Sequence, residues 1–116
     1  MQIQVNSSNQ IEGSARLNEW VRSTLESGLE RYAEDITRVE VHLSDDNGAK
    51  PGPHDKRCQL EARPKGHPPI AVSDTASTLE HAVDGATTKL NHALEHFYGK
   101  LRSKRVATPE LSDPDE

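Results

Sequence analysis

The sequence predicts an α+β domain, a β-α-β-β-β-α two-layer sandwich in which two helices pack on one face of a four-stranded sheet. Four short segments alternate polar and apolar residues, as strands with one buried face do. Two longer segments repeat apolar residues every three or four positions, as helices with one buried side do. Because every segment has a single apolar side, two layers are enough to bury them all.

The chain is expected to open with a strand and a long helix. Residues 1–6 (MQIQVN) alternate polar and apolar side chains, which places Ile3 and Val5 on one face of a strand. After a short polar turn, Ser14 is a suitable N-cap residue for the helix. The apolar residues expected along the buried side of this helix are Leu17, Trp20, Val21, Leu25, Leu29, Tyr32 and Ile36.

Three strands are expected next, separated by polar turns. Residues 37–43 alternate with their apolar side chains inward, and residues 44–55 form a long loop rich in Gly, Pro and Asp. Residues 56–63 form the third strand, with Cys58 among the inward residues. Residues 70–73 form the fourth strand. Two prolines just before it favour a place at the sheet edge, because proline has no N–H for a strand ladder.

A second long helix completes the expected fold. Ser77 and Glu80 have the spacing of a capping box, in which each side chain bonds the backbone N–H of the other residue. An apolar stripe at helical spacing follows at once, so the helix is expected to cover the sheet. The residues of this stripe are Leu79, Ala82, Val83, Ala86, Leu90, Ala93, Leu94, Phe97 and Leu101.

The composition is that of one small soluble domain of 116 residues. No apolar run is long enough for a signal peptide or a membrane span, and a single cysteine can form no internal disulfide. A reducing cytoplasm is therefore the expected setting. Residues 1–105 are expected to fold, whereas residues 106–116 hold four acids and no base and are expected to be a disordered acidic tail.

Basic residues gather in the last helix, where residues 89–105 hold five bases and one acid. Lys89, His92, His96 and Lys100 recur at three- and four-residue steps, so they are expected to form one solvent-facing stripe. Imidazole is only partly protonated near neutral pH, so the two histidines would be secondary to the lysines. Such a stripe either binds phosphate groups or only keeps the helix soluble, and the spacing alone leaves both readings open.

The sequence supports a metal site or a catalytic site less strongly than it supports a basic stripe. His92, Glu95 and His96 match the H-x-x-E-H pattern of inverted zinc peptidases, but a catalytic zinc needs a third protein ligand and a suitable scaffold. Cys58 is expected to be inert core, since it sits at an inward strand position. We therefore expect a binding protein with no catalytic residue, no metal site and no cofactor.

Two stretches of sequence, together with the order of elements, resemble the ribosome hibernation-promoting factor family. This family includes the ribosome-associated translation inhibitor and was formerly labelled sigma-54 modulation protein. The first stretch is MQIQVNSSNQIE running into the helix of residues 15–32. The second is IAVSDTASTLEHAVDGATTKLNHAL, in which A-V-D at 82–84 precedes K-L at 89–90 with the family's spacing. The resemblance covers residues 1–105.

The resemblance implies a cytoplasmic protein that binds the small ribosomal subunit at the RNA of the decoding region and keeps ribosomes idle in stress or stationary phase. It also implies a short form, without the C-terminal domain of longer members. No DNA, membrane or small-molecule substrate is expected as a partner. The residues expected to bind ribosomal RNA are Lys89, His92, His96, Lys100, Arg102 and Lys104 in the last helix, and Arg16 and Arg22 in the first.

An alternative is a protein–protein adaptor on the same fold, without ribosome binding. It would use the polar face of the sheet or the loop of residues 44–55. That face carries mixed charges and no aromatic side chain, so it is not expected to stack RNA bases.

Overall fold

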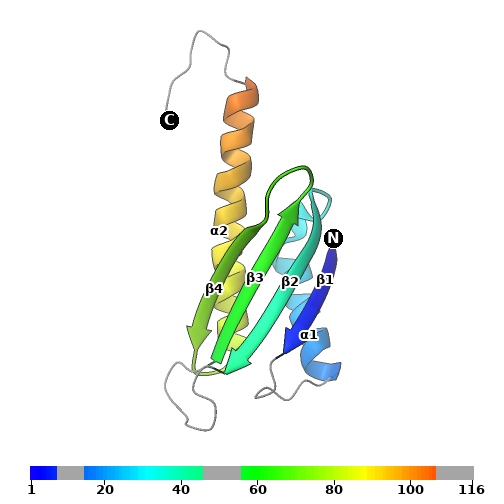
Figure 1. Ribbon diagram of the computed structural model, residues 1–116, viewed down its shortest axis with the longest axis vertical. Coiled ribbons are helices and arrows are strands. Elements are labelled where there is room, and N and C mark those ends of the chain that lie inside the picture. The colour runs from blue at the N-terminus through cyan, green and yellow to red at the C-terminus, as the bar shows by residue number, and fades with distance from the viewer. Residues whose placement is uncertain (8–14, 46–55, 107–116) are drawn as a thin grey trace.

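The protein is described by a computed structural model that covers residues 1–7, 15–45 and 56–106, with side chains described as far as residue 102. The predicted β-α-β-β-β-α order is confirmed, with one short 3₁₀ helix added after the first helix (Figure 1). The elements are β1 (Gln2–Ser7), α1 (Ala15–Gly28), η1 (Glu30–Tyr32), β2 (Ile36–Asp45), β3 (Lys56–Pro64), β4 (Ile70–Ala76) and α2 (Leu79–Val106).

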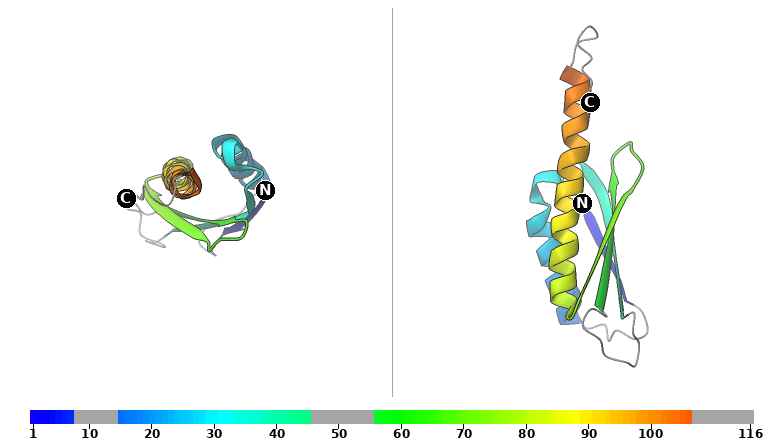
Figure 2. Two further views of the ribbon diagram at one scale, coloured as in Figure 1. Left: turned by 90° about the horizontal axis from the view of Figure 1, so that it is seen from above. Right: turned by 90° about the vertical axis from the view of Figure 1, so that its left-hand side faces the viewer.

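The four strands form one mixed sheet in the order β1-β2-β3-β4. β1 pairs with β2 in parallel, as expected for two strands joined through a helix, and the other pairs are antiparallel. β4 lies at an edge, as its preceding prolines predict. Both helices lie on the same face of the sheet (Figure 2). α2 packs against β3 and β4, and α1 packs against β1.

The core lies between the sheet and the two helices. The sheet contributes inward residues from alternate positions, such as Val39, Val41, Leu60 and Ala62, all of which are fully buried. The predicted stripe of α2 is buried from Ala82 to Leu94 except at Ala93, and Leu79 at its start is half-buried. The buried residues of the helices and of η1 are Val21, Leu25, Leu29, Tyr32, Ala82, Val83, Ala86, Leu90 and Leu94, together with Thr87.

The single cysteine belongs to this core. Cys58 has no exposed surface, and burial, with a smaller contribution from the negative charge of Asp74, raises the pKa of its thiol to about 12. A thiol with so high a pKa stays protonated at neutral pH and is a poor nucleophile. The geometry agrees with the prediction that Cys58 is inert core.

The end of the first helix differs from the prediction, because α1 ends at Gly28 and Ile36 belongs to β2. In a continuing α-helix the carbonyl of Gly28 would accept the N–H of Tyr32. That N–H instead donates to Leu29 O at 2.9 Å, and the side-chain amide of Asn91 donates to Gly28 O. The chain therefore tightens into η1 while Leu29 and Tyr32 remain buried. The apolar pattern identified buried residues correctly but not the element that carries them.

The start of the second helix also differs. The N-cap is Thr78 rather than Ser77, because Thr78 Oγ1 accepts the backbone N–H of His81 at 3.1 Å and the helix begins at Leu79. With this shift, Glu80 lies in the first turn but not at the third position that a capping box requires. The predicted N-cap of α1, Ser14, the body of the polar loop at 46–55 and the tail from residue 107 fall outside the described residues.

The last turns of α2 extend beyond the sheet (Figure 1). Phe97 and Leu101 continue the apolar stripe but are only half-buried, since no strand lies beneath this part of the helix. The helix nevertheless continues to Val106, one residue into the predicted tail. The basic end of α2 therefore lies on a projecting segment rather than on the body of the domain.

Candidate nucleic-acid interface

One side of α2 presents the predicted basic stripe. Lys89, His92, His96 and Lys100 are all exposed. At about 100° of rotation per residue, these four positions span roughly 80° of the helix circumference. They lie on the side of α2 that faces the β4 edge, because Lys89 contacts that strand. The sequence spacing thus predicted correctly that these side chains lie together.

Lys89 is bound within the protein. Its ammonium group lies 3.0 Å from Asp74 Oδ1 and 3.0 Å from the backbone carbonyl of Ser73, both in β4. Gly85 makes room for this contact, since a Cβ at that position would overlap the Asp74 carboxylate. The ion pair cancels one positive charge of the stripe. In the described part of the chain no ion pair forms at His92, His96 or Lys100, and these three carry the exposed positive potential.

Arg102 does not belong to this stripe. Two residues beyond Lys100, it lies about 160° away around the helix. Its side chain borders a pocket that also contains Arg31 and Tyr98. Lys104 lies in the helical part of the chain, but its side chain falls outside the described residues. Arg102 was expected to bind RNA together with the stripe, but it lies on another side of α2.

The two arginines expected to assist from α1 do not form a common patch. Arg16 and Arg22 are both exposed, but they are six positions apart, which places them about 120° apart around the helix. Exposed Glu19 and Glu26 lie on the same helix and reduce its positive potential. The basic residues of α1 are therefore dispersed, whereas those of the α2 stripe lie on one side of their helix.

The polar face of the sheet carries charges that are already paired. Glu40 lies at the centre, 2.6 Å from Arg38, 3.7 Å from Arg63 and 3.6 Å from His42. Glu61 lies 3.5 Å from the same Arg63. No aromatic side chain occurs in the four described strands, so this face offers no platform for base stacking. It is a mixed, internally neutralised surface.

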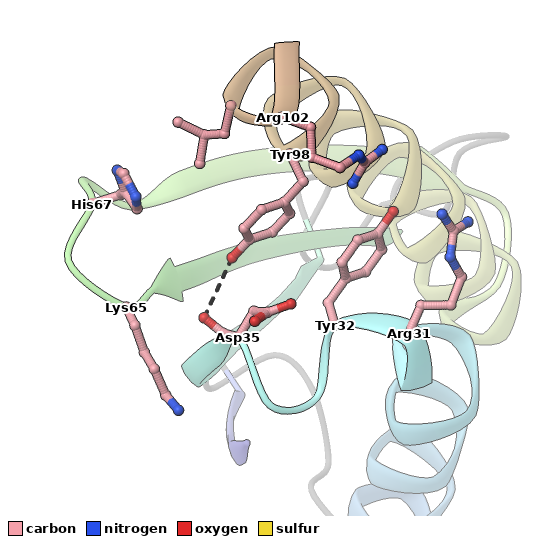
Figure 3. Close-up of a pocket in the computed structure, with 8 residues that line it drawn as sticks. Arg31, Tyr32, Asp35, Lys65, His67, Tyr98 and Arg102 are labelled. Carbon is pink, nitrogen blue, oxygen red and sulfur yellow. Dashed lines mark hydrogen bonds between the residues drawn. The ribbon is translucent and has the colours of Figure 1, made fainter. Parts of the chain in front are cut away.

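A pocket of about 370 Å³ lies where α2 passes η1 and the β3–β4 turn (Figure 3). Its lining combines aromatic, cationic and apolar side chains from three separate segments, so no local sequence pattern predicts it. Tyr98 donates a hydrogen bond to the Asp35 backbone carbonyl at 3.3 Å. Burial, with smaller contributions from Asp35 and Tyr32, raises the pKa of Tyr98. The lining residues are Arg31, Tyr32, Asp35, Lys65, His67, Tyr98, Leu101 and Arg102.

Neither a metal centre nor a membrane segment is found in the part of the chain that the structure describes. No three His, Cys, Asp or Glu side chains lie close enough together there to hold a metal ion. The described helices also lack a stretch that is both long and apolar enough to cross a membrane.

These features define a two-layer β-α-β-β-β-α domain with a cationic helix that projects beyond its sheet. A sequence model of the family described as sigma 54 modulation protein / S30EA ribosomal protein matches residues 3–102. The chain belongs to this family. Comparison with curated protein sequences gives no match.

Solved structures share the fold. The chain resembles the N-terminal domain of Protein Y from Thermus thermophilus, with a TM-score of 0.68, 20% identity and coverage of 84% of this chain and 99% of that one. It also resembles a ribosomal subunit interface protein from Coxiella burnetii, with a TM-score of 0.66, 18% identity and coverage of 85% and 99%. At these identities the likeness establishes the fold, and the predicted architecture is confirmed.

Proposed function

We propose that this cytoplasmic protein binds the small ribosomal subunit, at the RNA of the decoding region, and keeps ribosomes idle under stress or in stationary phase. Family membership supports ribosome association, as does the likeness to a ribosomal subunit interface protein. The observation that carries the RNA contact is the exposed stripe of His92, His96 and Lys100 on α2. The last turns of α2, where the stripe ends, project beyond the sheet (Figure 1).

The chemistry of this stripe suits RNA recognised through its backbone. Cations displayed along a rod-like helix can follow a row of phosphates without reading bases. Base stacking would need exposed aromatic rings, and the four described strands contain none. The proposed contact needs no cofactor and no reaction step.

The proposal predicts a steep dependence on salt. The protein should sediment with 30S-type subunits at 50 mM salt, and its Kd should rise on the order of 40-fold at 200 mM if three phosphates are contacted. Co-sedimentation of the purified chain with purified subunits across this range measures the slope. A Kd that stays constant across the range would instead favour the adaptor alternative, because a contact without phosphate neutralisation need not respond to salt.

Breaking the Lys89–Asp74 ion pair is expected to strengthen ribosome binding. The Asp74→Asn substitution removes the charge that holds Lys89, so Lys89 becomes available to phosphate. We expect Kd for the subunit to fall by roughly threefold, because one more cation faces the RNA. The fold should tolerate the change, since a partly exposed ion pair contributes only about 0–1 kcal/mol.

The matched control for this test is Lys89→Gln in the Asp74→Asn background. It leaves the carboxylate absent but removes the released cation, so Kd should return to the wild-type value or above. If Asp74→Asn alone weakens binding, the β4-facing side of α2 is not the RNA-binding surface.

A further inference from the structure

The pocket beside the projecting part of α2 is rich in positive charge. Arg31, Lys65 and Arg102 line it together with His67, against a single carboxylate from Asp35. Within the described residues none of the three cations forms an ion pair. The pocket is therefore a local excess of positive charge lined by three segments of the chain, unlike the stripe on the β4-facing side of α2, which belongs to one helix.

The buried hydroxyl of Tyr32 also indicates a ligand site. Tyr32 is 5% exposed, and its hydroxyl oxygen is buried without a hydrogen-bond partner among the described residues. Buried tyrosine hydroxyls normally find a partner, because an unsatisfied polar group costs free energy. Figure 3 shows this hydroxyl on the side of the pocket where the guanidinium groups of Arg31 and Arg102 lie. A ligand oxygen placed there would satisfy it.

The ring that carries this hydroxyl is held in place. Tyr32 stacks on Tyr98 with centroids 5.5 Å apart and an interplanar angle of 14°. The Arg31 guanidinium carbon lies 5.1 Å from the centroid of the Tyr32 ring. The hydroxyl of Tyr98 is already donated to the Asp35 carbonyl, so it is not free for a ligand. The stack thus fixes one unused donor beside two guanidinium groups.

We propose that this pocket binds a phosphoryl group, held by the guanidinium groups of Arg31 and Arg102 and by the hydroxyl of Tyr32. Guanidinium groups match phosphate oxygens in pairs, and a tyrosine hydroxyl donates one further hydrogen bond. Lys65 adds positive potential at the other side of the tyrosine stack (Figure 3). A cavity of about 370 Å³ accommodates a nucleotide as well as a lone phosphate.

The phosphoryl group has two chemical sources, the backbone of RNA or a free nucleotide. Two titrations of the full chain without ribosomes distinguish them, one with ADP and one with a six-residue oligouridylate, each followed by calorimetry and by amide shifts in NMR spectra. Amide shifts centred on residues 31–35 and 98–102 are expected for the ligand that enters the pocket. This inference does not rest on ribosome binding, which is measured separately by sedimentation.

The decisive variant is Tyr32→Phe, which deletes only the unpartnered hydroxyl. It should weaken binding of the ligand by about tenfold, as expected for a lost hydrogen bond to a charged group. Its thermal midpoint should equal or exceed that of the wild type, because the deleted hydroxyl has no partner in the protein. Arg31→Gln should weaken binding at least as much. Tyr98→Phe keeps the stacked ring and deletes only the hydroxyl bound to Asp35, so it should weaken binding less than Tyr32→Phe does.

Arg57→Gln supplies a charge control, because Arg57 lies on β3 outside the pocket and should leave Kd unchanged. The proposal is supported if ADP or the oligonucleotide binds and if Tyr32→Phe and Arg31→Gln both weaken that binding. The ligand that binds identifies the source of the phosphoryl group. Absence of binding by both ligands overturns it. So does binding that is indifferent to Tyr32→Phe, or that Tyr98→Phe weakens equally. Failure of the pocket to bind either ligand would not change the sedimentation result, so the pocket proposal and the ribosome-binding proposal can be rejected independently.

Discussion

Replacing His96 and Lys100 together with glutamate is expected to remove the protein from the ribosome fractions of a sucrose gradient. Both side chains are exposed, and neither forms an ion pair within the described residues, so the change acts on the surface and not on the core. Loss of the charge-assisted contact of Lys100 weakens binding by about tenfold, and loss of a hydrogen bond from His96 adds to this, so Kd should rise by more than about tenfold. Repulsion between the new carboxylates and phosphate adds to this loss. Sedimentation with purified small subunits measures it.

The matched control is the pair Arg57→Glu and Gln59→Glu on the polar face of the sheet. With neutral imidazole, each double variant lowers the formal charge by 3, as 1 + 2 for His96 and Lys100 and as 2 + 1 for the control. Circular dichroism should show a folded domain in both. If the control variant loses ribosome binding and the α2 variant keeps it, the sheet face is the interface and the proposed surface is wrong.

Leu90→Ala is expected to produce the largest loss of stability. Leu90 is fully buried at the centre of the α2 stripe, where it packs between the helix and the sheet. Truncating a buried leucine to alanine costs about 2–5 kcal/mol, because apolar contacts are lost and a cavity remains. Since a small domain has only about 5–15 kcal/mol of stability, this is a large share. Urea unfolding followed by circular dichroism measures the change.

Thr88→Ala on the same helix is the matched control. Thr88 is exposed, and its hydroxyl only donates back to the Asp84 carbonyl at 3.1 Å within the helix. Its loss should change the free energy of unfolding by no more than about 0.5 kcal/mol. Equal effects of the two substitutions would contradict the description of α2 as a core helix.

Most of the fold follows from periodicity. The four strands and two helices were predicted because alternation and helical spacing each depend only on local sequence, and each element buries a single side. The ends of the helices were harder to predict than their existence. α1 stops at Gly28, where the carbonyl accepts the side-chain amide of Asn91 from α2 and not the N–H of Tyr32. A contact between residues 63 positions apart is not visible in a local pattern.

The candidate site was predictable in part. Helical spacing grouped Lys89, His92, His96 and Lys100 correctly on one side of α2. It could not show that Lys89 pairs with Asp74, because this pair depends on the close approach of β4 to α2 at Gly85. The pocket could not be predicted either, because its lining comes from three segments that only the fold brings together. Whether the grouped cations bind ribosomal RNA stays a prediction.

The projecting end of α2 has a consequence for local order. Phe97 and Tyr98 still contact His67 and Tyr32, but none of the described residues beyond Tyr98 is buried, so the last turns depend mainly on hydrogen bonds within the helix itself. Gly99 lies in this segment, and glycine inside a helix is less favourable than alanine by about 1 kcal/mol. We therefore expect this end to open locally far more often than the core-bound turns. A ligand that binds there must also hold these turns in the helical conformation, which reduces its net binding free energy. The affinity of this end of α2 is therefore expected to be sensitive to temperature and to substitution at Gly99.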